Sequence, residues 1–244
     1  MSDLIVSPSY VQPEMFSPQL PDWPFEGLEP FAYSLIMIDP PWHFKTRSKK
    51  GDAKSPQAKY RTMTVDAIRA LPVADLATKD SLLWMWGTGP MLDVQISIME
   101  SWGYKFKTAG TWVKTTRHGK IAFGTGYLLR QCAEYYLIGT RGKPKTVSKS
   151  VRSAFLSPLR EHSRKPESSY EMARKLVPYG RAADLFSRQS REGWENWGDE
   201  KDLFDGDYKR TSFGKPRSRR GIEATRDQTA LGDLELRSRI AIGD

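Results

Sequence analysis

The sequence has few of the residues on which disulfide and metal scaffolds depend. It contains one cysteine, Cys132, so an internal disulfide is excluded, and its three histidines have no metal-ligand spacing with that cysteine. The longest apolar run, residues 35–38, is far shorter than the roughly 20 residues of a membrane-spanning helix, and Asp3 stands where a signal peptide would be basic. We therefore expect a soluble, unsecreted, cytoplasmic protein without a membrane or metal partner.

Positive charge is missing from the start of the chain and concentrated in its middle. The first 42 residues carry six acids and no Lys or Arg, whereas residues 43–177 carry 25 bases and 10 acids, within a net charge of +9 over 244 residues. A basic middle region favours a nucleic-acid partner, because phosphates attract Lys and Arg whatever the base sequence. A basic surface kept for solubility explains the same imbalance.

The hydrophobic pattern predicts one α/β domain between two less regular segments. Residues 1–30 hold six prolines and are expected to form an extended arm, residues 31–204 a folded domain, and residues 205–244 a basic, flexible tail. Apolar runs predict strands and helical spacing predicts helices, in alternation, which indicates a mostly parallel sheet with helices on both faces. The expected strands are 33–39, 81–86, 105–114, 131–140 and 181–186, the helices begin near 64, 90 and 169, and a basic loop spans 142–166.

The tetrapeptide Asp39-Pro40-Pro41-Trp42 follows the first buried strand, where open α/β sheets place ligand-binding groups. Two prolines fix a rigid turn that offers a carboxylate, outward carbonyls and an aromatic face. An exocyclic amine of a flipped-out base needs such acceptors and a flat stacking surface. A strand-ending turn whose tryptophan packs in the core is the competing interpretation.

Residues 33–200 carry an ordered series of short motifs that resembles the adenine-N6 methyltransferases, the family of the catalytic subunit of the eukaryotic messenger-RNA methylating enzyme and of many bacterial and phage relatives. The motifs after Asp39-Pro40-Pro41-Trp42 are Tyr60-Arg61-Thr62-Met63, Trp86-Gly87-Thr88, Trp112-Val113-Lys114-Thr115, Gly124-Thr125-Gly126-Tyr127, Glu134, Arg164-Lys165-Pro166-Glu167, Asp184-Leu185-Phe186-Ser187-Arg188, Gly193-Trp194 and Trp197-Gly198. The resemblance implies a Rossmann-like methyltransferase fold in permuted motif order, with S-adenosylmethionine as cofactor. No Gly-x-Gly-x-x-Gly follows the first strand, which agrees with the permuted order.

The resemblance implies that Asp39, Pro40, Pro41 and Trp42 are the catalytic residues. Acceptance of the amine protons by the Asp39 carboxylate and the Pro40 carbonyl makes N6 of adenine nucleophilic. Trp42, or Tyr60 from the basic loop, stacks on the base. The substrate-binding candidates are Trp42, Tyr60, Lys45, Arg47, Lys114 and Lys165.

The cofactor-binding candidates implied by the resemblance are Ile38, Asp39, Lys165, Asp184, Phe186, Arg188, Asp199 and Glu200. For Lys165 a phosphate contact is an alternative interpretation of equal weight, and for Ile38 a core position is one. Many relatives have Glu where this chain has Asp184, and amides are common where it has Asp199-Glu200. These two departures weaken the corresponding assignments.

The sequence thus predicts a methyltransferase acting on adenine N6 in DNA, because the compact chain resembles the bacterial and phage members. RNA adenine methylation is the main alternative, followed by a non-catalytic nucleic-acid-binding subunit and a small-molecule amine methyltransferase. Target choice is expected to come from residues 43–63, residues 142–166 or the tail. The oligomeric state, a homodimer included, stays open.

Overall fold

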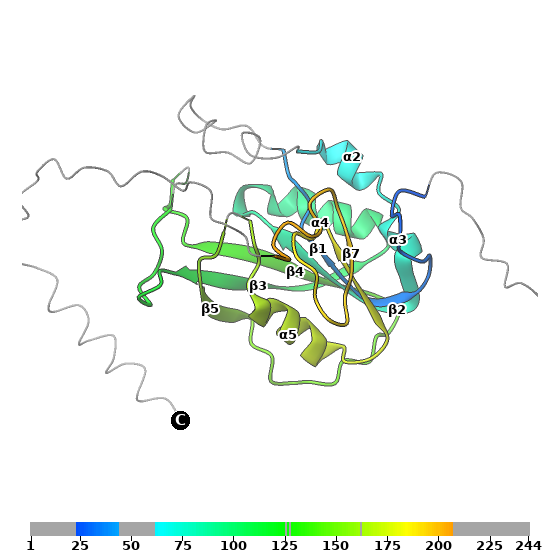
Figure 1. The fold of residues 1–244 in the computed structure, drawn as a ribbon. Coiled ribbons are helices and arrows are strands. Elements are labelled where there is room, and N and C mark those ends of the chain that lie inside the picture. The colour runs from blue at the N-terminus through cyan, green and yellow to red at the C-terminus, as the bar shows by residue number, and fades with distance from the viewer. Residues whose placement is uncertain (1–22, 44–61, 125, 127, 162, 207–244) are drawn as a thin grey trace, which may run out of the picture. The chain divides into compact units, whose positions relative to one another are not determined.

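The computed structural model describes residues 23–43, 62–124, 126, 128–161 and 163–206, all within one compact unit. In these residues the chain forms a seven-stranded sheet in the order β5-β3-β4-β2-β1-β6-β7 (Figure 1). β4 runs antiparallel to β2 and β3, and the other four pairings are parallel. The strands are β1 (Tyr33–Ile38), β2 (Ala77–Gly87), β3 (Lys105–Thr115), β4 (Ala133–Arg141), β5 (Ala154–Pro158), β6 (Arg181–Leu185) and β7 (Glu195–Trp197).

The described helices are short and begin where the sequence provides a start signal. α2 (Val65–Arg69) is capped by Thr64, whose hydroxyl accepts the Ala67 N–H at 3.2 Å. α3 (Val73–Leu76) was not expected from the sequence and follows Pro72, while the 3₁₀ turn η2 (Gly89–Met91) leads into α4 (Leu92–Ser101). α5 (Glu167–Leu176) begins after Pro166. None of these helices is long and apolar enough to cross a membrane.

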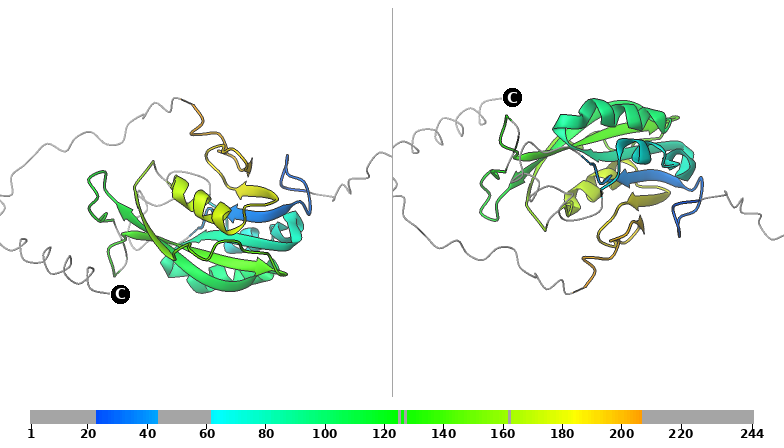
Figure 2. Two further views of the ribbon diagram at one scale, coloured as in Figure 1. Left: turned by 90° about the horizontal axis from the view of Figure 1, so that it is seen from below. Right: turned by 90° about the horizontal axis from the view of Figure 1, so that it is seen from above.

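Helices cover both faces of the sheet, as expected from the sequence (Figure 2). Successive side chains of a strand point to opposite faces. Ile36 and Ile38 of β1 belong to the core cluster that includes α2, α3 and α4, whereas Leu35 and Met37 belong to the cluster that includes α5. The predicted Rossmann-like α/β class is therefore confirmed, with β4 making the sheet mixed.

The packed region begins before the domain boundary predicted at residue 31. Phe25 is fully buried, and its ring meets the edge of Trp197 with the centroids 5.0 Å apart. Trp23 donates its indole N–H to the Leu28 carbonyl at 3.0 Å. Residues 23–30 therefore pack on the core, and the rest of the predicted arm, residues 1–22, lies outside the described residues.

The basic segment 142–166 contains β5, which pairs with β3 from Thr111 to Thr115. Its side chains are alternately exposed and half-buried, so it lacks the continuous apolar run of a buried strand. β5 runs parallel to the last part of β3, and from its end the chain continues to Ser163 and Lys165. The segment predicted as a loop therefore contains an edge strand that leads toward the site described below.

Candidate active site

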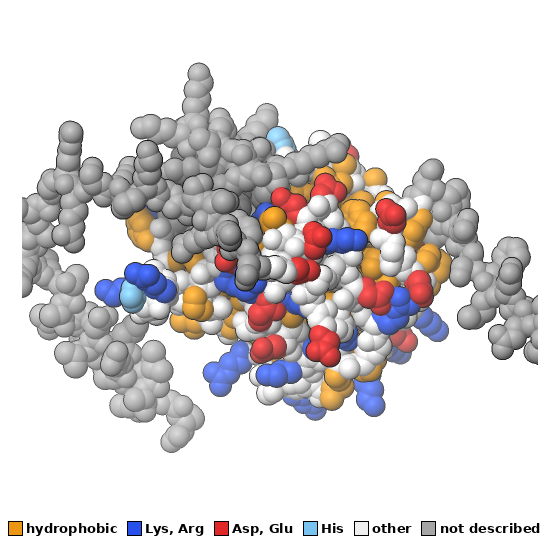
Figure 3. All heavy atoms as spheres, viewed as in Figure 1, with side chains coloured by type: hydrophobic (Ala, Val, Ile, Leu, Met, Phe, Trp, Pro, Cys, Tyr) orange, Lys and Arg blue, Asp and Glu red, His pale blue; other side chains and the backbone are white. Residues whose placement is uncertain are grey.

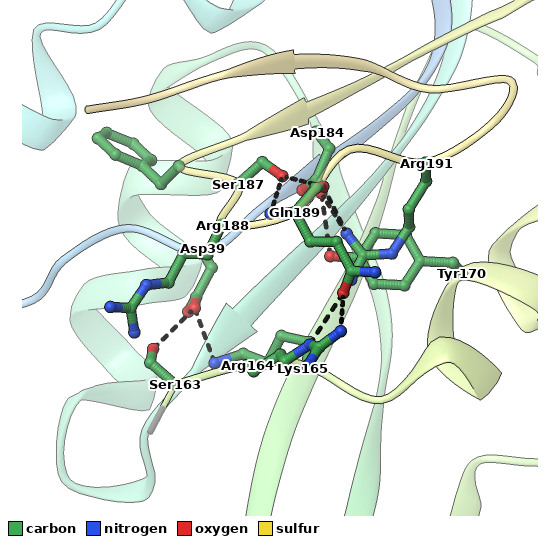
Figure 4. A pocket seen from close by; sticks show the side chains of 11 residues that line it. Asp39, Ser163, Arg164, Lys165, Tyr170, Asp184, Ser187, Arg188, Gln189 and Arg191 are labelled. Carbon is green, nitrogen blue, oxygen red and sulfur yellow. Dashed lines mark hydrogen bonds and ion pairs between the residues drawn. The ribbon is translucent and has the colours of Figure 1, made fainter. Parts of the chain in front are cut away.

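A pocket lies at the carboxyl ends of the neighbouring strands β1 and β6 (Figure 4). The helices α2 and α3 that follow β1 pack on one face of the sheet, and α5, which precedes β6, packs on the other. Crevices between such strands are the usual ligand sites of open α/β sheets. The lining residues are Asp39, Ser163, Arg164, Lys165, Tyr170, Asp184, Phe186, Ser187, Arg188, Gln189 and Arg191.

Asp39 begins the turn that follows β1. Its backbone N–H donates to the Leu185 carbonyl at 3.2 Å, so β6 fixes the start of the turn. One residue on, the Pro40 carbonyl accepts the Trp42 N–H at 2.8 Å. A carbonyl oxygen has two lone pairs, so Pro40 retains one acceptor site.

Trp42 does not present the exposed aromatic face expected from the sequence. Its side chain is only 6% exposed, and its indole N–H points to the Trp86 carbonyl at 3.4 Å. A backbone bridge to Met63 holds this part of the chain against the core. The turn buries Trp42 because the apolar ring gains more from the core than from solvent.

Four side chains of alternating charge form a chain that ends on Asp39. Lys165 Nζ lies 2.7 Å from Asp39 Oδ2 and 3.2 Å from Glu134 Oε2. Lys114 Nζ lies 2.5 Å from Glu134 Oε1. The lysine predicted to bind substrate, Lys114, therefore contacts Glu134, and Lys165 joins two carboxylates from different strand ends.

Burial and the lysines act in opposite directions on the two carboxyl groups. Burial raises the pKa of Asp39 above its ordinary value, although Lys165 opposes this rise. Burial also raises the pKa of Glu134, but the ammonium groups of Lys165 and Lys114 outweigh it and lower that pKa to about 2. Glu134 therefore stays ionised and holds Lys165 beside Asp39.

Two residues of the pocket adopt the left-handed backbone conformation that favours glycine. Ser163 has φ 62° and Phe186 has φ 61°. Such conformations cost about 1–3 kcal/mol each and concentrate at binding and catalytic sites. Ser163 donates its hydroxyl to Asp39 Oδ2 at 3.4 Å, and Phe186 meets Trp197 edge-on with ring centroids 5.1 Å apart.

Asp184 lines the pocket, and its Oδ2 atom is bound by two side chains of the protein. Its side chain accepts hydrogen bonds from the Tyr170 hydroxyl at 3.0 Å and from Arg191 at 3.3 Å, as Figure 4 shows. Arg191 also stacks on the Tyr170 ring at 3.6 Å. Burial raises the pKa of Asp184 to about 6 despite the Arg191 charge. These two contacts engage one oxygen of the carboxylate, and the cofactor-binding role of Asp184 stays a prediction.

The remaining cofactor candidates lie in different environments. Arg188 forms an ion pair with Glu200 at 2.7 Å beside the pocket, and Asp199 is exposed. Ile38 is fully buried in the core, which agrees with the core interpretation of its side chain. Three substrate candidates, Lys45, Arg47 and Tyr60, lie outside the described residues.

The site includes side chains to which the sequence assigned no role. Glu134 appeared only in the motif series, and its signal was a single acid at the start of an apolar strand. Ser163 and Arg191 had no sequence signal, because their contacts depend on the path of the loops around α5. Among the described residues, no three His, Cys, Asp or Glu side chains are grouped to hold a metal ion.

Known proteins match the part of the chain that contains this pocket. The MT-A70 family model matches residues 33–200, the part of the chain that contains the sheet and the pocket. The type II methyltransferase M.MunI of Mycoplasma is 31% identical over 192 residues, which cover 71% of this chain and 80% of M.MunI.

Longer relatives match over the same region. The N(6)-adenosine-methyltransferase MT-A70-like of Arabidopsis thaliana is 31% identical over 69% of this chain, and the human catalytic subunit METTL3 is 28% identical over 64%. The matched region spans about a quarter of each of these two proteins, 24% and 26%. With a family match that covers most of its length and includes every described residue of the pocket, the chain belongs to the MT-A70 family.

Proposed function

We propose that this protein is an S-adenosylmethionine-dependent methyltransferase that methylates the N6 amine of adenine in DNA. The observation that carries the proposal is the Asp39 carboxylate, held 2.7 Å from Lys165 at the carboxyl end of β1. Family membership and the names of the relatives, which are adenosine-N6 and type II methyltransferases, support the reaction class.

The Asp39-Pro40 turn offers the acceptors that the reaction requires. The lone pair of the adenine amine is delocalised into the ring, so the amine is a weak nucleophile. Acceptance of its two N–H groups by the Asp39 carboxylate and the second lone pair of the Pro40 carbonyl restores that nucleophilicity. With S-adenosylmethionine bound, the methyl group would pass from the sulfur to N6, and the N6 proton released would go to Asp39 or to water.

The cofactor has an amino-acid end, ribose hydroxyls and an adenine, and the pocket offers a partner for each. The Asp39 carboxylate and Lys165 ammonium match the charged amino and carboxylate groups, and Arg188 with Glu200 offers polar groups for the hydroxyls. The Phe186 ring at the pocket provides an apolar surface for the adenine of the cofactor. When bound, S-adenosylmethionine supplies an electrophilic methyl group, and Lys165 orients Asp39 beside it.

DNA is favoured over RNA by one comparison. The match to M.MunI, a type II methyltransferase, covers 80% of that protein. The N(6)-adenosine-methyltransferases of plants and animals match over about a quarter of their length and favour RNA as the second candidate. Asp39 stands intact and ion-paired in the site, which argues against a non-catalytic subunit.

A tritium-transfer assay on DNA and RNA oligonucleotide pools of matched sequence tests the proposal. We expect labelled N6-methyladenine in DNA and none with Asp39→Ala. Labelling of RNA alone would overturn the choice of DNA. If neither polymer is labelled under conditions in which the folded protein binds both, the catalytic assignment fails. A small-molecule amine substrate is favoured if nucleic-acid binding is weak and independent of salt concentration.

A further inference from the structure

The loop between β3 and β4 (residues 116–132, the β3–β4 loop), which the structure describes except at residues 125 and 127, exposes large apolar side chains to solvent. The exposed fractions are 80% for Phe123, 91% for Leu128 and 83% for Leu129, and Ile121 is 54% exposed. Ala122 is buried between Ile121 and Phe123, so these two side chains point away from the packed side of the backbone. Four large apolar side chains exposed within one loop make this loop a candidate interaction site.

The β3–β4 loop begins and ends at the same end of the sheet as the candidate active site, where β1 and β6 have their carboxyl ends. β4 is antiparallel to β2, which places the loop at the same edge as the carboxyl end of β1 (Figures 1 and 2). The Ala122 N–H donates to the Lys114 carbonyl at 2.8 Å, and the Gly124 N–H donates to the Gln131 carbonyl at 2.9 Å. Lys114 is the outer member of the charge chain that ends on Asp39, so the exposed apolar group adjoins the catalytic carboxylate network.

The charge of this loop identifies the kind of partner. Residues 115–133 include Arg117, Lys120 and Arg130 and no Asp or Glu. The Arg130 guanidinium lies over the Phe123 ring at 5.2 Å, which combines a cation and an aromatic face. On the face in Figure 3, Lys, Arg and His side chains lie with hydrophobic ones at the left, where Figure 1 draws this loop. A second copy would bring like charges together, whereas a nucleic acid supplies phosphates beside apolar base faces.

We propose that the β3–β4 loop is a wedge that enters duplex DNA beside the target adenine and fills the space left when that base leaves the stack. This inference rests on the proposed function, because only a base that reacts outside the helix requires such a wedge. Proteins that unstack a base step insert apolar side chains such as Phe and Leu, and their cations hold the flanking phosphates. Phe123, Leu128 and Leu129 provide the apolar group, and Arg117, Lys120 and Arg130 the cations.

The test compares methyl transfer to the same DNA sequence in its single-stranded and double-stranded forms. Methyl transfer is measured on a circular single-stranded phage DNA and on its double-stranded form, with the full chain and with Phe123→Ala and Leu128→Ala/Leu129→Ala variants. Base–aromatic stacking is worth about 5- to 150-fold per base, so we expect the ratio of double-strand to single-strand kcat/KM to fall at least about fivefold. Val147→Ala, an exposed apolar residue whose backbone is bonded to the end of α5, is the matched control and should leave the ratio unchanged.

The outcomes separate this inference from the proposed function. Equal losses on both strand states, or no loss on either, overturn the wedge while methylation by the unaltered chain upholds the activity. If the unaltered chain methylates no adenine in either DNA, the proposed function itself fails. Sedimentation velocity gives a second criterion: a dimer that becomes a monomer in the Leu128→Ala/Leu129→Ala variant would assign this loop to a protein interface and overturn the wedge.

Discussion

Replacement of Asp39 by asparagine removes the charge of the central carboxylate and keeps its shape. The variant keeps one carbonyl acceptor but loses the ionised oxygen that lies 2.7 Å from Lys165. A charge-assisted hydrogen bond is worth about 1.5–3 kcal/mol, and a positioned proton acceptor contributes roughly 10²- to 10⁴-fold in rate. We expect kcat on DNA to fall by about 10²- to 10⁴-fold, measured as tritium transferred per enzyme at saturating cofactor.

The same substitution should not destabilise the fold. The folded pKa of Asp39 is raised, so its ionised form is disfavoured in the folded state, and the stability contributed by this group is lost as the pH rises through that pKa. A neutral side chain relieves this cost at pH 7, and Lys165 keeps Glu134 at 3.2 Å. The Tm of Asp39→Asn should equal or exceed that of the unaltered chain in a thermal melt followed by circular dichroism.

The two measurements together can refute the reasoning. A change of 1 kcal/mol shifts the Tm of a unit of this size by about 2–4 °C, so even a small loss is visible. A lower Tm with a parallel loss of activity would make Asp39 a structural residue, and activity within threefold of the unaltered chain would end its catalytic role. Asp93→Asn, an exposed aspartate in the first turn of α4, is the matched control.

Three further predictions concern the residues around Asp39. The pKa of Glu134 is lowered from 4.5 to about 2, so its charge contributes up to about 3 kcal/mol that is present above pH 4.5 and is lost as the pH falls toward 2. In urea unfolding at pH 7, the Glu134→Gln variant should therefore be less stable than the unaltered chain. An unchanged urea midpoint would contradict a stabilising role for the ion pairs of Glu134. The pKa of Asp184 is raised from 3.8 to about 6, so up to about 3 kcal/mol of stability is present below pH 3.8 and lost as the pH rises through 6. Asp184→Asn should flatten the pH dependence of unfolding between pH 4 and 7, and a curve parallel to that of the unaltered chain would count against this. A Cβ on Gly198, which has φ 143°, lies 2.9 Å from the Phe186 Cα, so Gly198→Ala should lower stability by about 1–3 kcal/mol and weaken S-adenosylmethionine binding in calorimetry. An unaltered affinity for S-adenosylmethionine would show that Phe186 does not contribute to the cofactor site.

The inner strands could be predicted from sequence and the outer ones could not. β1 is buried along its whole length and appears as a nearly continuous apolar run, and β6 is a short strand whose last four residues are buried. β5 has alternating exposure at one sheet edge, and β7 has three half-buried residues at the other. Edge strands are stabilised by pairing with a neighbour that is distant in sequence, and local hydrophobicity does not reveal that neighbour.

The position of Asp39 could be predicted, but the direction of Trp42 could not. A carboxylate after a buried strand falls at the sheet edge whatever the rest of the chain does. The residue after two prolines points inward or outward according to what lies beneath it, which here is the Trp86 carbonyl and the Met63 backbone. The stacking face for a base is thus left to Tyr60, which lies outside the described residues and stays a prediction.

The number of cations in the middle of the chain did not indicate which of them could meet phosphate. Lys114 and Lys165 belong to the basic region, yet each lies within 3.2 Å of a carboxylate in the site. A carboxylate taken out of water needs such a partner, so these charges are balanced by Asp39 and Glu134. The long-range attraction for a polyanion must then come from Lys and Arg residues other than Lys114 and Lys165. Within the described residues, the β3–β4 loop offers three, with no acid between them, and presents them beside exposed apolar side chains at the same sheet edge.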